Sequence, residues 1–380
     1  MAAPASWGGT LNKNIIFESL YNMIIGQEVY SENIGRTFTS LVDRARVDGS
    51  LYGDTYLKYS TNALRTYAFE PDTTNQLNVL AVHRPEDPHV QAITVDTYRW
   101  IPATIDTYLS KQPFMTETAF ADFNSVTLSW VRETKRIYDA TFYNAFVGTV
   151  ETSEGSQQQT ADFGTTIIPA VSTTVDEEAK NRLIAEILAQ KLQDIFVALR
   201  DIGTSFNDLG YYRAVDSSSM EVIWNADWVN LIRKVGLPTI FHKDGLLEIK
   251  EENILPAKYF GSVNSSATAG GTGIMSLIEQ TIGTGVNEHH YWPGEEIASG
   301  DTAPAGTSYT KTAGVLTAGS VICKIIHKGD IPYMSAYETE TTFINGKNLS
   351  ENHYLHFGHN TLQHIHEYPL ITVKCAMTNS

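Results

Sequence analysis

The pattern of apolar positions is most regular over residues 116–147, where it predicts one long helix. Trp130 and Ile137 lie seven residues apart on one strip, and Val131 and Tyr138 lie on a second apolar strip beside it. A helix of about 32 residues is about 48 Å long, which is well above the usual length. We therefore expect this helix to run across a whole domain, with its tryptophan, Trp130, in the core.

Two more helices follow in the pattern. Apolar residues at three- and four-residue steps follow Asp176, which is expected to cap this second helix, and Gly203 is expected to end it. Residues 220–224 form a short apolar run that predicts a strand, and Asn225 or Asp227 is placed to cap the helix after it. This order of strand and helix is typical of a compact α/β unit.

Extended chain dominates residues 50–112, where tyrosines lie among Thr, Leu and Val on both sides of a polar segment with several prolines. The pattern predicts a long two-stranded ribbon with a proline-rich tip. Such a ribbon is only marginally stable by itself, so it needs a surface to lie on, within the subunit or on a neighbour. Tyrosine is enriched at interfaces, which supports the second possibility, while a role for these rings in the core stays open.

The two ends of the chain and its later part give weaker patterns. Residues 14–25 suggest a short amphipathic helix in an N-terminal arm that docks on something else. Residues 261–320 are rich in Gly, Ser, Thr and Ala, which predicts an insertion of loops and turns. Asn345-Gly346 predicts a hairpin, and residues 353–367 and 370–374 are expected to be the last two strands.

Composition narrows the class of protein. The chain has 380 residues and a formal net charge of −16, so it does not suit sequence-specific binding to phosphate backbones. Cys323 and Cys375 are too few for a disulfide framework, and we expect two buried, reduced thiols. The first ten residues lack the pattern of a signal peptide, and no apolar run reaches the roughly 20 residues of a membrane-spanning helix. We therefore expect a protein made and used in a cytoplasm, or in something assembled there, with no membrane partner.

One cluster of side chains has chemical potential near the end of the chain. It contains five histidines: His353, His356, His359, His364 and His366. We expect His364 and His366 to share a strand face, where two or three imidazoles could meet a metal ion. No cysteine or carboxylate spacing of a known zinc type accompanies them, so packed or solvated strand histidines are the favoured interpretation. The sequence shows no nucleotide-binding loop or nucleophile elbow either, and we predict no catalytic, cofactor-binding or metal-binding residues.

The order of arm, extended ribbon, long helix and α/β unit resembles the Hong Kong 97-type major capsid proteins of tailed phages. The likeness covers roughly residues 10–376, and short stretches support it: 94–100 as the return strand of the extended loop, 120–148 as the spine helix, 221–225 before a helix, and 343–373 as the closing β pattern. The insertion at 261–320 is longer than a minimal axial domain requires. No long helical scaffolding segment begins the chain, which implies a separate scaffolding protein or a matured form.

This resemblance implies an α+β fold with five parts: an N-arm (1–47), an extended loop (48–112), a peripheral domain with the spine helix (113–202), an axial domain (203–342, with the insertion 261–320) and a return to the peripheral domain (343–380). It implies a non-enzymatic shell subunit of the virion, assembled in the host cytoplasm as hexamers and pentamers around double-stranded DNA. It also implies scaffolding, portal and decoration proteins as partners. The alternatives are an encapsulin-like cargo shell, another structural phage protein, and a metal-dependent enzyme that uses the C-terminal histidines.

Overall fold

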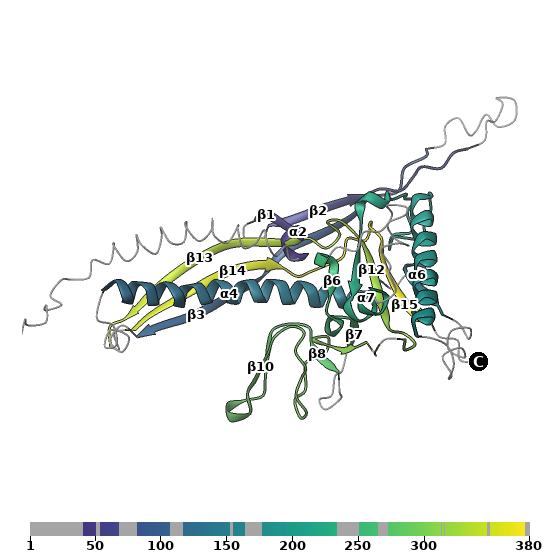
Figure 1. Ribbon diagram of the computed structural model, residues 1–380. Coiled ribbons are helices and arrows are strands. Elements are labelled where there is room, and N and C mark those ends of the chain that lie inside the picture. Colours follow the sequence, from purple (N-terminus) through teal and green to yellow (C-terminus); the bar gives the residue numbers. More distant parts are fainter. Residues whose placement is uncertain are drawn as a thin grey trace, which may run out of the picture.

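The computed structural model describes residues 41–50, 54–67, 82–106, 117–152, 155–163, 177–233, 251–264, 273–312, 314, 316–347 and 350–376. A long helix and a long sheet run side by side through most of an elongated body, and a second, compact sheet lies at one end (Figure 1). The α-helices in this part of the chain are α2 (Leu41–Ala45), α4 (Glu117–Thr149), α6 (Glu177–Arg200) and α7 (Ala226–Arg233). The three longer helices lie where the sequence predicts them, whereas the predicted helix at 14–25 lies outside the described residues.

The compact sheet, which we call the core sheet, has the strand order β4-β15-β12-β5-β6. Its strands are β4 (Gln158–Asp162), β5 (Met220–Asn225), β6 (Ile254–Leu255), β12 (Val321–His327) and β15 (Leu370–Ala376). The central strand β12 is antiparallel to β5 and β15, and the outer strands pair in parallel. Asn225 ends β5 and caps α7, because its Oδ1 accepts the backbone N–H of Asp227 at 3.1 Å.

Both faces of the core sheet are covered. One face packs on α6 and α7 through a cluster that includes Leu188, Leu192, Trp224, Trp228 and Ile325. The other face packs on the last turns of α4 through Tyr143, Ala145, Val147, Ile223 and Ile326. Strands that are buried on both faces read as continuous apolar runs, which is why residues 321–326 lack alternation. Cys323 and Cys375 are free thiols buried here, as the sequence predicts.

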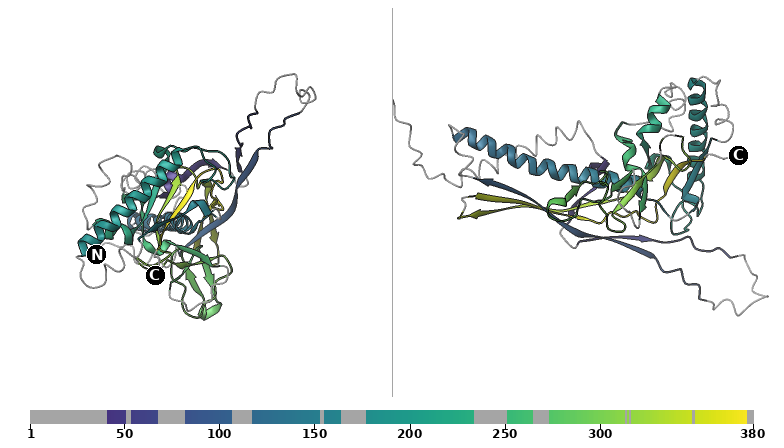
Figure 2. Two further views of the ribbon diagram at one scale, coloured as in Figure 1. Left: turned by 90° about the vertical axis from the view of Figure 1, so that its right-hand side faces the viewer. Right: turned by 90° about the horizontal axis from the view of Figure 1, so that it is seen from below.

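The second sheet, which we call the long sheet, has the order β1-β13-β14-β3-β2. Its strands are β1 (Arg46–Ser50), β2 (Thr55–Ser60), β3 (His89–Asp106), β13 (Tyr333–Asn345) and β14 (Ser350–Asn360). The hairpin predicted at Asn345-Gly346 is confirmed, because Asn345 pairs with Ser350. Only the start of β3 pairs with β2, and its later residues pair with β14. The predicted ribbon is therefore two-stranded only where Thr55–Ser60 pairs with His89–Thr94. Residues 61–67 and 82–88 continue from these strands without strand structure and project from the body (Figure 2), and we call them the outer ribbon.

The prediction of loops and turns for residues 261–320 is incomplete. The segment contains β7 (Gly261–Asn264), β8 (Ile274–Ser276), β9 (Gln280–Ile282), β10 (His289–Tyr291) and β11 (Ser308–Lys311). They form a β7-β11-β8 sheet and a β9-β10 pair, with Tyr291, Ile297 and Ala303 buried between them. A Cβ at Gly261 would lie 2.1 Å from the carbonyl oxygen of Thr310. Small residues here allow close strand approach rather than irregular chain.

The strand predicted over residues 353–367 is wrong in its second half. β14 ends at Asn360, whose Oδ1 accepts the backbone N–H of Met334 at 2.7 Å and whose Nδ2 donates to the Pro332 carbonyl at 3.0 Å. The backbone N–H of Ile365 then donates to Asp330 at 3.1 Å. These contacts turn the chain out of the sheet, so His364 and His366 lie in a loop and not on one strand face.

Candidate functional site

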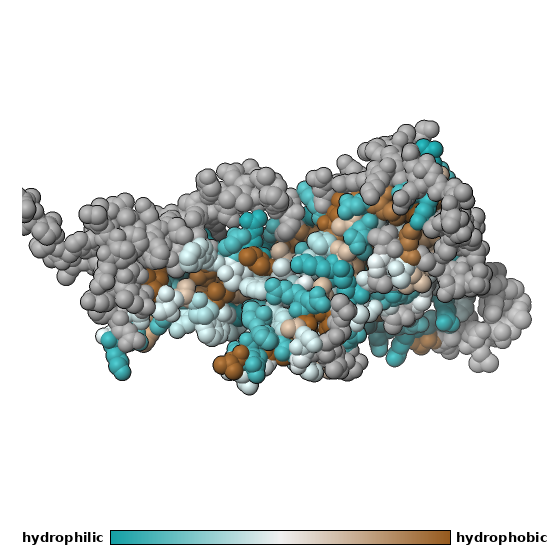
Figure 3. All heavy atoms as spheres, turned by 60° about the horizontal axis from the view of Figure 1, so that its bottom comes forward, coloured by the Kyte–Doolittle hydropathy of each residue, from teal (hydrophilic) through white to brown (hydrophobic). Residues whose placement is uncertain are grey.

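The long sheet and the segments around its outer end leave many large apolar side chains exposed. The side chain of Tyr59 is 60% exposed, that of Trp100 is 53% exposed and that of Phe343 is 65% exposed. Others in the same region are Tyr56, Leu57, Leu64, Tyr67, Val82, Val90 and Ile344. Figure 3 shows one face of the molecule, where apolar groups lie scattered among hydrophilic ones along the body. Large apolar side chains exposed on several neighbouring strands of one sheet favour an interaction surface.

Helix α4 contributes to this exposed apolar surface. Val131 and Tyr138 are buried against the rest of the fold, whereas Trp130 is 61% exposed and Ile137 is 43% exposed. The helix thus packs through one of its two apolar strips, and the prediction that Trp130 lies in the core is wrong. Trp228 on α7, by contrast, is fully buried as predicted. Among the described residues, the long sheet packs on one side of α4 and leaves the second apolar strip exposed.

Three of the five C-terminal histidines lie along β14 and have separate partners. His359 is 1% exposed, its Nδ1 donates to the Asn360 carbonyl at 2.9 Å, and its Nε2 accepts from the Tyr138 hydroxyl at 2.8 Å. Burial lowers the pKa of His359, which keeps this ring neutral. His353 lies 3.3 Å from Glu340, and His356 contacts Thr341 and the Tyr98 hydroxyl. These three rings do not converge on one point.

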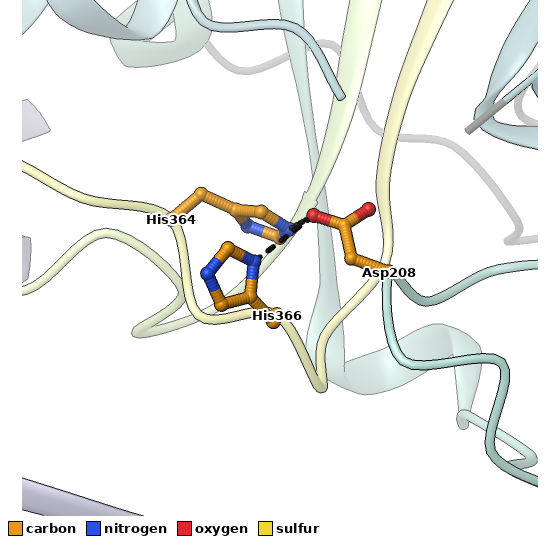
Figure 4. A group of neighbouring side chains, drawn as sticks. All are labelled: Asp208, His364 and His366. Atoms are coloured by element: carbon orange, nitrogen blue, oxygen red, sulfur yellow. Dashed lines mark hydrogen bonds and ion pairs between the residues drawn. The ribbon is translucent and has the colours of Figure 1, made fainter. Parts of the chain in front are cut away.

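His364 and His366 do converge, and they meet an aspartate that the sequence analysis missed. Asp208 Oδ2 lies 3.1 Å from His366 Nδ1 and 3.5 Å from His364 Nε2 (Figure 4). One ligand atom from each of the three residues lies within 4.8 Å of the others. Asp208 is 158 residues from His366 in the chain, so no local spacing signals the contact. The backbone supports it, since the Asp208 N–H donates to the His366 carbonyl at 3.0 Å.

A second carboxylate lies behind His364. Asp330 is fully buried and accepts from His364 Nδ1 at 2.7 Å. Burial works against the charged imidazole, but Asp208 and Asp330 outweigh it and raise the pKa of His364 to about 9. Burial raises the pKa of Asp330, while the bonds from His364 and Ile365 oppose that change. On the other side, Gln157 Nε2 donates to Asp208 Oδ1 at 2.7 Å, which fixes the orientation of that carboxylate.

The histidine–aspartate cluster lies at the base of the outer ribbon. Gln91 on β3 donates from Nε2 to the His364 carbonyl at 2.8 Å and accepts the His366 backbone N–H at 3.0 Å. Glu367 accepts from Ser60 Oγ at 2.8 Å and from Arg213 Nε at 3.0 Å. The loop that carries His364 and His366 therefore joins β2 and β3 to the segment that follows α6.

A hollow of about 410 Å³ lies between β3, α4 and the insertion. Arg99 and Glu279 line it and form an ion pair at 2.7 Å, which ties the insertion to the long sheet. The Arg99 guanidinium also lies 4.8 Å from the centre of the Tyr138 ring. Arg99 and Glu279 in the hollow thus pair with each other within the fold. None of the helices described here is long and apolar enough to cross a membrane.

Comparison with known proteins gives a result at the level of the fold. No family model matches the chain, and no curated protein matches it. Among solved structures, a chain in the capsid structure of Staphylococcus phage Andhra is similar with a TM-score of 0.52 and 10% identity, over 87% of this chain and 83% of that one. A chain in the structure of the head fiber and inner core protein gp22 of native bacteriophage P68 is similar with a TM-score of 0.53 and 10% identity, over 88% and 84%. The chain has a mixed α+β fold that is shared along most of its length with chains of phage structures.

Proposed function

We propose that the chain is a major capsid protein that self-assembles into the icosahedral shell of a tailed phage and encloses its double-stranded DNA. The observation that carries the proposal is the exposed apolar side of the long sheet and its ribbon, with Tyr59 60% and Trp100 53% exposed in the single chain. A partner that covers these side chains removes apolar surface from water, which favours association. The fold likeness to the chain of the phage Andhra capsid supports a copy of the same chain as that partner.

The five parts of the Hong Kong 97-type fold give the proposal its geometry. The outer ribbon, within residues 48–112, reaches across a neighbouring subunit in the shell, and the N-arm, residues 1–47, does likewise. Helix α4 is the spine of the peripheral domain at 113–202. The axial domain, 203–342, contacts its copies around the axes of hexamers and pentamers, and the chain returns to the peripheral domain at 343–380. An edge strand such as β2 favours pairing with a further chain, which supports this use of the ribbon.

The charge of the chain suits an inner wall against DNA. With a formal net charge of −16, the protein repels phosphate backbones on average. An inner wall of this charge does not bind packed DNA tightly. The proposed partners are further copies of the chain, a scaffolding protein, a portal and decoration proteins. The proposed location is the virion, with assembly in the host cytoplasm and with no enzymatic activity of the shell subunit itself.

Assembly of the purified chain tests the proposal. The full chain, co-expressed with its scaffolding protein, is expected to give closed particles in negative-stain microscopy and a matching high mass in light scattering. Leu57→Asp, which adds a charge to a side chain that is 47% exposed on β2, is expected to leave the chain folded but unassembled. Val286→Asp is the matched control, since Val286 is fully exposed on the insertion. A wild-type chain that stays monomeric with its scaffold contradicts the proposal.

The encapsulin-like cargo shell remains an alternative, and the contents of the particles separate the two functions. Particles from an infected or induced host that contain double-stranded DNA support the phage capsid. Particles that contain a folded enzyme with a common docking peptide support the cargo shell. Both outcomes need the same self-assembling subunit, so this measurement follows the assembly test.

A further inference from the structure

The geometry points to a zinc site formed by Asp208 Oδ2, His364 Nε2 and His366 Nδ1, which fastens the base of the outer ribbon to the body of the subunit. The inference does not depend on the proposed function, because the site is made within one chain. It differs from the metal-dependent enzyme considered from the sequence, since only two of the five C-terminal histidines take part and the third ligand is a distant aspartate.

Two of the three separations between the donor atoms fit one small ion, and the third, between the two imidazole nitrogens, is within 4.8 Å. Asp208 Oδ2 lies 3.5 Å from His364 Nε2 and 3.1 Å from His366 Nδ1. Two ligands of a tetrahedral zinc ion with bonds of about 2.0–2.1 Å lie roughly 3.3 Å apart, so both separations already match. Figure 4 shows both rings directed at the same carboxylate oxygen. Two imidazoles and one carboxylate form a ligand set that suits zinc better than calcium or magnesium, which prefer oxygen ligands.

His364 gives the independent sign of a ligand. His364 is only 7% exposed, and its buried Nε2 makes no hydrogen bond of ordinary length, because its contact with Asp208 Oδ2 is a long ion pair at 3.5 Å. A buried polar atom whose only contact is long is poorly compensated for its loss of water, and a bound ion would improve that compensation. Zinc would take the place of the proton on Nε2, since a histidine ligand must be neutral.

The groups behind the ligands have the arrangement that metal sites use. Asp330 accepts from His364 Nδ1 at 2.7 Å, which leaves Nε2 as the free nitrogen and fixes the plane of the ring. Gln157 Nε2 occupies Asp208 Oδ1 at 2.7 Å, which leaves Oδ2 for the ion. A carboxylate behind a histidine ligand strengthens its basicity and its orientation. Asp330 thus leaves His364 Nε2 available to the ion, and Gln157 leaves Asp208 Oδ2 available to it.

The three ligands come from two parts of the chain, and this gives the ion a structural role. Asp208 belongs to the segment after α6, whereas His364 and His366 belong to the loop that Gln91 ties to β3. A bridging ion would hold these two parts at a fixed distance and so fix the direction in which the ribbon leaves the body. The side chain of His366 is 46% exposed, so the fourth position faces solvent and suits a water molecule.

Zinc content of the full-length chain tests the site. The chain is expressed with added zinc, purified without chelator, dialysed, and analysed by plasma mass spectrometry. We expect about one zinc ion per wild-type chain and loss of at least about tenfold in zinc affinity for His366→Gln. His289→Gln is the matched control, because His289 is also about half exposed at 52% and also contacts an aspartate through Nδ1, at 2.8 Å from Asp301. This variant is expected to bind zinc as the wild type does.

Thermal unfolding gives a second readout. A chelator is expected to lower the unfolding temperature of the wild type and of His289→Gln, and to leave that of His366→Gln unchanged, because a ligand of the folded state stabilises it by mass action. Asp208→Asn serves as a second variant if His366→Gln fails to fold. A wild-type chain without zinc at saturating free metal overturns the inference. Equal zinc affinity in the wild type and in a folded His366→Gln or Asp208→Asn variant overturns it as well.

Discussion

The core sheet and the long sheet each have five strands, but they differ in what covers them. Trp224 on β5 of the core sheet is 1% exposed between α6, α7 and the neighbouring strands, whereas Trp100 on β3 of the long sheet is 53% exposed. Helices cover both faces of the first sheet, and α4 follows one side of the second (Figure 1). The same residue type in the same kind of strand thus belongs to the interior in one sheet and to the surface in the other.

The difference separates stability from association. Full burial of a large apolar side chain is worth about 1.5–3 kcal/mol relative to exposure. In the core sheet, this free energy of burial is gained within one chain. In the long sheet, part of it is gained only when a partner covers the exposed side chains. We therefore expect changes in the core sheet to alter the free energy of unfolding of the single chain, and changes on the outside of the long sheet to alter association.

The largest expected effect is the difference between two tryptophan variants. Trp224→Ala removes a fully buried ring and leaves a cavity, so the free energy of unfolding is expected to fall by about 3–5 kcal/mol. Trp100→Ala removes an exposed ring whose contact is the edge of Tyr354 at a centroid distance of 5.5 Å, so the expected loss is below about 1 kcal/mol. Urea unfolding of the unassembled chain measures both. Similar losses in the two variants would contradict the division between the sheets.

A second effect concerns the lysines of the two sheets. Lys324 on β12 is fully buried, and burial lowers its pKa to about 7 from the usual 10.5. Between these values the unfolded chain binds one more proton than the folded chain, so the free energy of unfolding rises with pH by up to about 1.4 kcal/mol per unit. Lys324→Met is expected to abolish this rise. The difference in free energy of unfolding between Lys324→Met and the wild type should therefore shift in favour of the wild type as the pH goes from about 7 to 10.

Lys58 on β2 gives the matched control with the opposite sign. Burial acts against its charge, but Tyr368 and Glu367 outweigh burial and raise the pKa of Lys58 above 10.5. Its contribution is present below 10.5 and disappears only at higher pH, so Lys58→Met should differ from the wild type by a constant amount between about pH 7 and 10. Denaturant titrations at several pH values measure both variants. A constant difference for Lys324→Met would show that water reaches this side chain in the core sheet.

The apolar patterns of the chain were enough to predict the three longer helices and the longer strands. The apolar steps before Gly203 give α6, and Asn345-Gly346 gives the β13–β14 hairpin. Periodicity does not tell which apolar strip meets the sheet, so the burial of Trp130 was predicted wrongly. The ordered strands around Gly261 were missed because their stability comes from close backbone pairing rather than from apolar alternation. These failures have one cause: each depends on what lies opposite in space.

The sequence identifies the two histidines of the histidine–aspartate cluster but not its aspartates. The histidines stand out by their number, yet three of the five have separate partners along β14. Asp208 and Asp330 have no local mark in the sequence, since only the tertiary fold brings them to His364. The turn after Asn360, which depends on Met334 and Pro332, decides which histidines can meet. The spacing of the histidines within residues 353–366 therefore cannot predict these contacts.

The smallest expected effect lies at the junction of the two regions. Glu367 accepts from Arg213 Nε at 3.0 Å and lies 3.4 Å from Lys58 Nζ, so it links the segment after α6 to β2. Glu367→Gln keeps the size of the side chain and removes the charge, and partly exposed ion pairs contribute about 1 kcal/mol or less. We expect little change in global stability.

The effect should instead be local to the ribbon. Amide hydrogen exchange is expected to become faster in β2 of the Glu367→Gln variant and to stay unchanged in β5, because β2 is the last strand of the long sheet as described and depends on this side-chain link. Glu340→Gln is the control, since Glu340 lies on β13 and its partner His353 lies on β14, the neighbouring strand of the same sheet. Faster exchange in β5 as well as in β2 would mean that the two sheets open as one cooperative unit, and the division between a stable core sheet and a separately mobile long sheet would then fail.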